Sequence, residues 1–119
     1  MTERFKRFRP RHRRTPGTMN KTEQAYAERL DLLRRGGEIR SWRFEGIKLR
    51  LAEKTFLTPD FYVVTHDQME LHEVKGGFVE DDAVVKIKVA AEMYPEFAFK
   101  MIFAKIRGGC MEITEVREY

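Results

Sequence analysis

The chain has 119 residues and a net charge of +4 at pH 7, with 42% hydrophobic residues and a single cysteine, Cys110. This length favours one domain with one core, and a single cysteine excludes an internal disulfide framework or a Cys-based zinc site. No apolar run is long enough to span a bilayer, and the basic first residues lack the apolar segment of a signal peptide. We therefore expect a cytoplasmic protein that is not inserted in a membrane.

Positive charge is concentrated at the amino terminus. Residues 1–14, MTERFKRFRPRHRR, hold seven Lys or Arg and one Glu, so the rest of the chain is slightly acidic. We predict a flexible basic arm over residues 1–17 and a single globular domain over residues 18–119. Such an arm is typical of proteins that bind a polyanion, most often nucleic acid, although it can also serve only solubility. The cationic side chains of the arm are Arg4, Lys6, Arg7, Arg9, Arg11, Arg13 and Arg14.

The stretch NKTEQAYAERLDLLRRGG, residues 20–37, predicts the first helix. Asn20 is a suitable N-cap, apolar residues recur at helical spacing from Tyr26 to Leu33, and two glycines end the stretch. Residues 38–51 then alternate between apolar and charged side chains around Gly46. This alternation predicts one or two strands bent at a bulge or turn.

Residues 57–77, LTPDFYVVTHDQMELHEVKGG, predict a β-hairpin. Its first strand is rich in aromatic and β-branched residues, residues 66–68 (HDQ) form a polar turn, and a glycine pair ends its second strand. The hairpin places Asp60 beside the second strand. Residues i and i+2 of a strand project from one face about 7 Å apart, so Glu73 and Lys75 share a face.

The remaining residues predict a helix followed by two strands. Residues 80–95 begin with acidic side chains, carry an apolar helical stripe and end at Pro95. Residues 97–106 form an apolar run typical of a buried strand, and residues 110–119 alternate as an edge strand does. We therefore expect an α/β fold, in which helices flank a central mixed sheet of four to five strands.

Asp60, Glu73 and Lys75 are candidates for one chemical site. Hydrolysis of a phosphodiester near neutral pH needs a hard divalent cation, carboxylates that hold it and a positive group near the reacting phosphate. Oxygen ligands favour Mg²⁺ or Mn²⁺ over zinc. In this interpretation Asp60 and Glu73 bind the metal, and Lys75 positions or deprotonates the attacking water. The alternative is a solvated strand face beside an ordinary turn, because Glu-x-Lys triplets are common.

Pro59-Asp60 followed, after twelve residues, by Glu73-Val74-Lys75 resembles the PD-(D/E)XK nuclease superfamily. The resemblance covers approximately residues 20–104 and is closest to small phage endonucleases of the endonuclease I and Holliday junction resolvase type. It implies a restriction-endonuclease-like αβββαβ core. It also implies a cell location in a bacterial host or a phage-infected cell.

The same resemblance assigns roles to individual residues. It implies that Asp60, Glu73 and the backbone carbonyl of Val74 hold the metal, and that Lys75 is catalytic. Members of the superfamily also carry a glutamate on the first helix that holds the metal or its water, and Glu23 matches it. The spacing Asn20-x-x-Glu23 is equally that of a capping box, in which Glu23 only binds a backbone donor.

Two lysines of the second predicted helix are candidates for phosphate contacts. Lys88 borders the apolar stripe and is the better candidate, while Lys86 lies on the opposite side. His72 adjoins Glu73 but points to the other face of its strand, which favours packing over catalysis.

These patterns predict a Mg²⁺- or Mn²⁺-dependent DNA endonuclease. The small size favours selection by DNA shape, such as a branch or junction, or by an associated protein, and a symmetric junction would favour a homodimer. One alternative is a non-catalytic nucleic-acid-binding protein in which the acidic residues are structural. Another is an assembly or DNA-packaging accessory that keeps a nuclease-like fold for protein contacts.

Overall fold

The computed structural model describes residues 17–119. The seven cations predicted to bind nucleic acid through the basic arm lie outside this range. Within it, no helix is both long enough and apolar enough to cross a membrane.

Helix α2, Lys21–Arg35, begins and ends where the sequence predicts. The Asn20 side chain accepts a hydrogen bond from the Glu23 N–H (2.8 Å), and the Glu23 carboxylate accepts one from the Asn20 N–H (3.0 Å). This reciprocal pair satisfies two backbone donors that a helix start leaves without partners. The helix ends at Gly36, and Gly37 takes a left-handed conformation (φ 81°) that glycine adopts without strain.

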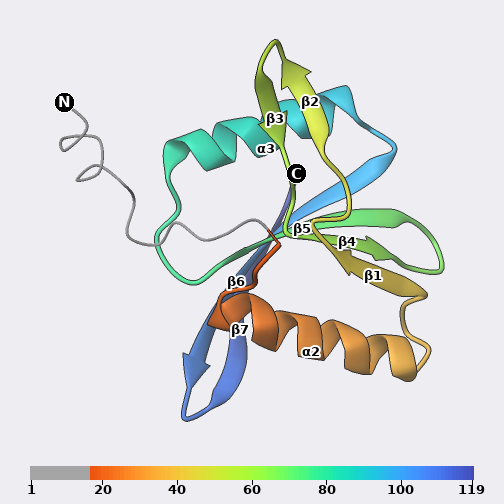
Figure 1. The fold of residues 1–119 in the computed structure, drawn as a ribbon, viewed down its shortest axis with the longest axis vertical. Coiled ribbons are helices and arrows are strands. Elements are labelled where there is room, and N and C mark those ends of the chain that lie inside the picture. The colour runs from red at the N-terminus through yellow and green to blue at the C-terminus, as the bar shows by residue number, and fades with distance from the viewer. Residues whose placement is uncertain (1–16) are drawn as a thin grey trace.

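A five-stranded mixed sheet forms the centre of the fold, in the order β1-β4-β5-β6-β7 (Figure 1). Every neighbouring pair is antiparallel except β5 and β6, which are parallel and are joined through helix α3, Asp81–Met93. A parallel pair needs such a crossover connection. The strands are β1 (Ser41–Phe44), β4 (Phe61–Val64), β5 (Met69–Lys75), β6 (Phe97–Arg107) and β7 (Cys110–Glu118). The predicted α/β class and mixed sheet are confirmed.

Strands β2, Leu49–Ala52, and β3, Thr55–Leu57, form a separate antiparallel ribbon. The chain turns out of the main sheet at Glu45, which has a positive φ of 50°, and at Gly46, where a Cβ atom would lie 3.0 Å from the Arg43 Cβ. The bend predicted around Gly46 is present. The ribbon itself was not predicted, because β3 is too short to show a periodic pattern.

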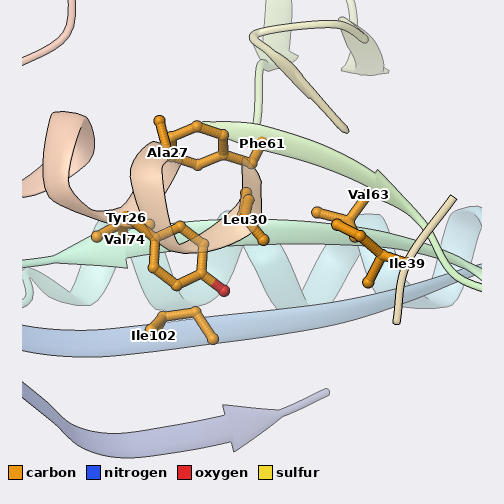
Figure 2. Packing of buried hydrophobic residues seen from close by; sticks show 8 residues of the cluster. All are labelled: Tyr26, Ala27, Leu30, Ile39, Phe61, Val63, Val74 and Ile102. Atoms are coloured by element: carbon orange, nitrogen blue, oxygen red, sulfur yellow. The ribbon is translucent and has the colours of Figure 1, made fainter. Parts of the chain in front are cut away.

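The helices cover opposite faces of the sheet, each over its own hydrophobic cluster. On the α2 face, Tyr26, Ala27 and Leu30 pack against residues of β4, β5 and β6 (Figure 2). Phe61 is fully buried there, with its ring centroid 5.4 Å from that of Tyr26. This packing fixes the start of α2 relative to the start of β4 and the end of β5, where the candidate site lies. On the α3 face, Ile87 and Ala90 pack on Leu71, Phe99 and Met101.

Candidate active site

The hairpin register brings Asp60 next to the end of β5. Phe61 pairs with His72, so Asp60, which directly precedes β4, comes beside Glu73. The Asp60 N–H donates to Glu73 Oε1 (3.1 Å), and the Val74 N–H donates to Asp60 Oδ2 (2.8 Å). Each carboxylate is therefore held by a backbone donor of the other strand. The two candidate metal ligands lie together, as the hairpin predicts.

Lys75 is the last residue of β5 and lies on the same strand face as Glu73. Its Nζ lies 3.7 Å from Glu73 Oε2, and the two side chains are 28% and 15% exposed. The Lys75 side chain is therefore partly shielded from water, and it lines the cavity described below. The face shared by Glu73 and Lys75 is the one that strand periodicity predicts.

Glu23 approaches the same site from the other side of the sheet. It is 3% exposed, and its carboxylate oxygen binds the Asn20 N–H as a capping box requires. Burial is the main cause of the raised pKa of Asp60, and the Glu23 carboxylate contributes to it through its charge and a side-chain hydrogen bond. Capping the helix and facing the site are thus compatible roles for this one side chain.

A cavity of about 410 Å³ joins these groups. Four of its lining side chains are acidic, namely those of Glu23, Asp60, Glu73 and Glu80, and Lys75 is the basic one. An acidic cavity repels a phosphate unless a cation is also bound. The full lining consists of Asn20, Glu23, Asp60, Glu73, Val74, Lys75, Gly76, Phe78, Glu80 and Ala83.

The crowding of carboxylates changes the titration of Asp60. The pKa of its carboxyl is raised from 3.8 to about 8, chiefly by burial and also by the charges of Glu73 and Glu23, against the hydrogen bond from the Val74 N–H. Without a cation, the Asp60 carboxyl therefore holds a proton at neutral pH. A cation that binds there must displace this proton, so its affinity increases as the pH rises.

The oxygen donors at this site fit an open Mg²⁺ or Mn²⁺ site better than a metal site that protein ligands close completely. Within residues 17–119, no group of three or more His, Cys, Asp or Glu side chains is arranged to hold a metal ion by itself. Mg²⁺ commonly uses only one or two carboxylates and completes its shell with water and substrate phosphate. Asp60 and Glu73 meet that need. The N–H and C=O groups of one strand residue point toward the same edge of the strand. Because the Val74 N–H donates to Asp60, the Val74 carbonyl also points toward the edge that faces Asp60.

The two lysines of α3 are not part of this cavity. Lys86 donates from its Nζ to the Phe56 carbonyl oxygen of β3 (3.2 Å), and it therefore fastens α3 to the ribbon. Lys88 is exposed on α3 and does not line the cavity. Any phosphate contact that Lys88 makes lies outside the carboxylate site.

A buried polar chain on the α2 face was missed by the sequence analysis. His72 is 6% exposed, with its Nδ1 2.7 Å from the Tyr26 hydroxyl and its Nε2 2.8 Å from Glu70 Oε1. The pKa of Glu70 is lowered to about 2, chiefly by the hydrogen bond to His72, and the charge of Lys100, 3.3 Å away, contributes to this lowering. His72 is packed, as its strand face predicts. The spacing of Glu70 and His72 on the face opposite Glu73 was a signal available in the sequence.

This polar chain ties α2 to β5 next to the site, and its loss should be measurable. Replacing Tyr26 with phenylalanine removes the hydroxyl and leaves His72 Nδ1 buried without that partner. We expect the free energy of unfolding to fall by about 1–3 kcal/mol, the usual cost of such a group. Urea unfolding at pH 7 measures it. A change below about 0.5 kcal/mol would show that water or a rearranged ring replaces the hydroxyl.

Comparison with known proteins adds no assignment. No protein-family model matches the chain. A search of curated proteins also finds no significant match.

Proposed function

We propose that the chain is a metal-dependent endonuclease that hydrolyses phosphodiester bonds in DNA with Mg²⁺ or Mn²⁺. The supporting observation is the arrangement of Asp60, Glu73 and Lys75, which line one cavity and are linked by short contacts between two strands. Their order, Pro59-Asp60 and Glu73-Val74-Lys75, resembles that of PD-(D/E)XK nucleases. The proposal thus rests on geometry and sequence order together.

Each residue has a distinct task in this proposal. A bound divalent cation would neutralise phosphate charge and lower the pKa of a coordinated water. Asp60, Glu73 and the Val74 carbonyl would hold that cation, and Glu23 would orient the water. Lys75 would stabilise negative charge on the phosphate or accept the proton of the water.

The charge of the cavity supports a cation-dependent activity. The acidic side chains outnumber the single lysine in the lining, so a bare phosphodiester would be repelled. Burying like charges is also costly, and the raised pKa of Asp60 reflects that cost. A divalent cation removes both penalties.

DNA binding would come from outside the cavity. The basic arm, residues 1–17, would supply contacts to the phosphate backbone that do not depend on sequence, and Lys88 would add one from α3. Selectivity for branched or junction DNA would then come from DNA shape, and a symmetric junction would be met by a homodimer. A cytoplasmic location in a bacterial host or phage-infected cell belongs to the same proposal.

A nuclease assay tests the function directly. Four-way junction, flap and linear duplex DNA are incubated with the full chain in Mg²⁺, in Mn²⁺ and in EDTA. We expect cleavage in both metals, fastest on a branched substrate, and none in EDTA.

One outcome of this assay and one result from a truncated chain would support the alternatives. Tight DNA binding without cleavage in either metal would favour a non-catalytic nucleic-acid-binding protein. If removal of residues 1–14 abolishes DNA binding but leaves binding to a partner protein intact, an accessory role is favoured.

A further inference from the structure

Phe78 is exposed at the rim of the acidic cavity. Its residue exposure is 88%, the highest among the large hydrophobic residues within residues 17–119 that are exposed. It follows the glycine pair that ends β5 and precedes α3. It lines the same cavity as Asp60, Glu73 and Lys75. An aromatic side chain is therefore presented to solvent beside the candidate catalytic groups.

Two other partly exposed phenylalanines within residues 17–119 differ from Phe78. Phe56 is 39% exposed and carries the Lys48 ammonium 4.5 Å from its ring centroid. Phe103 is half-buried beneath the Arg117 guanidinium, at 4.7 Å. A ring as exposed as that of Phe78 loses the stabilisation that burial gives, so a packing role does not account for it.

The lining of the cavity is both charged and apolar. Asp60, Glu73 and Lys75 contribute charged groups, while Phe78 and Ala83 contribute apolar surface. A nucleotide combines the same two kinds of surface, because a charged phosphate is joined to a flat base. The volume of about 410 Å³ lies within the range of small-ligand pockets. A Cβ atom built on Gly77 would meet nothing within 4 Å, so the backbone beside Phe78 is open to a bound strand.

We propose that Phe78 is a stacking platform for an unpaired nucleobase of the DNA whose phosphate lies beside Asp60, Glu73 and Lys75 in the cavity. This inference rests on the proposed nuclease function and specifies its substrate. A base inside a duplex already stacks on both neighbours, whereas an unpaired base presents a free face to an aromatic ring. Phe78 therefore favours cleavage beside unpaired nucleotides, as in a flap or an open branch point, over cleavage within continuous duplex.

Binding measurements in a cleavage-deficient background test the proposal. Fluorescence anisotropy with Mg²⁺ compares Lys75→Ala with Lys75→Ala/Phe78→Ala on a flap substrate and on a duplex of the same length. We expect Phe78→Ala to weaken flap binding about 5- to 150-fold, the range for loss of one base–aromatic stack, and to change duplex binding less than twofold. Phe78→Trp should retain flap binding. Phe56→Ala is the matched control and should change neither affinity.

A flap whose unpaired nucleotides are abasic separates stacking from a general structural effect. On that substrate Phe78→Ala should have no further effect, because the base that stacks is already missing. Equal weakening on flap, abasic flap and duplex would overturn the proposal. A change in oligomeric state of Phe78→Ala without a change in flap affinity would also overturn it and would make Phe78 a protein contact.

The two proposals fail in distinguishable ways. If wild type cleaves the flap in Mg²⁺ and Phe78→Ala cleaves and binds it equally well, only the stacking proposal is wrong. If wild type cleaves no DNA in Mg²⁺ or Mn²⁺, the nuclease function is wrong, and the assignment of Phe78 to a nuclease substrate is wrong with it.

Discussion

Replacing Asp60 with asparagine should abolish cleavage and at the same time stabilise the metal-free protein at pH 8. The variant loses a charged ligand, while its amide oxygen can still accept the hydrogen bond from the Val74 N–H. A bound catalytic cation contributes several kcal/mol, so we expect cleavage to fall about 1,000-fold or more. A nuclease assay in Mg²⁺ measures this loss.

The gain in stability follows from the pKa of Asp60. The folded chain raises this pKa from 3.8 to about 8, so over that interval it keeps a proton that the unfolded chain has released. The protonated Asp60 carboxyl therefore contributes fully to the stability of the wild type below the unfolded pKa. That contribution to the free energy of unfolding is lost as the pH rises toward 8. Asparagine cannot ionise, so the variant does not lose stability in this way as the pH rises. We expect a gain on the order of 2 kcal/mol in free energy of unfolding at pH 8, and little gain at pH 4.

Urea unfolding of both proteins in EDTA, at pH 4, 6 and 8, checks this dependence. Asp67→Asn is a matched control, because Asp67 is exposed in the β4–β5 turn and does not line the cavity. An Asp60→Asn variant that cleaves like wild type would remove Asp60 from the catalytic group. A stability difference that is the same at every pH would show that Asp60 is already ionised in the folded protein.

Replacing Lys75 with alanine should reduce kcat about 100- to 1,000-fold and leave DNA affinity nearly unchanged. Lys75 is the one basic side chain lining the cavity, and its ammonium lies 3.7 Å from the Glu73 carboxylate. Loss of one group that stabilises charge in a transition state typically costs this much in rate. Binding should persist, because the proposed backbone contacts come from the basic arm and Lys88.

Steady-state cleavage of a branched substrate separates these two effects. Lys75→Arg restores a positive charge with a different shape and should recover part of the rate. Lys88→Ala is the comparison variant, and we expect it to raise KM several-fold without lowering kcat, as loss of a phosphate contact does. If Lys75→Ala and Lys88→Ala both changed only KM, Lys75 would be a binding residue.

Short-range patterns in the sequence predicted much of the fold and part of the site. The turn at residues 66–68 and the two-residue period of the strands set the pairing of Phe61 with His72, and that pairing puts Asp60 beside Glu73. The Asn20 cap and the glycines after Arg35 likewise set the limits of α2. These features depend on residues close together in the chain, so they can be read without the fold.

Contacts between distant segments decided the rest. The packing of α2 on Phe61 brings Glu23 to the strand carboxylates and buries the chain of Tyr26, His72 and Glu70. Burial then raises the pKa of Asp60, and the course of the chain into α3 leaves Phe78 at the cavity rim. Burial and the distance between charges depend on the assembled helices and sheet, and so no local pattern of residue types specifies them.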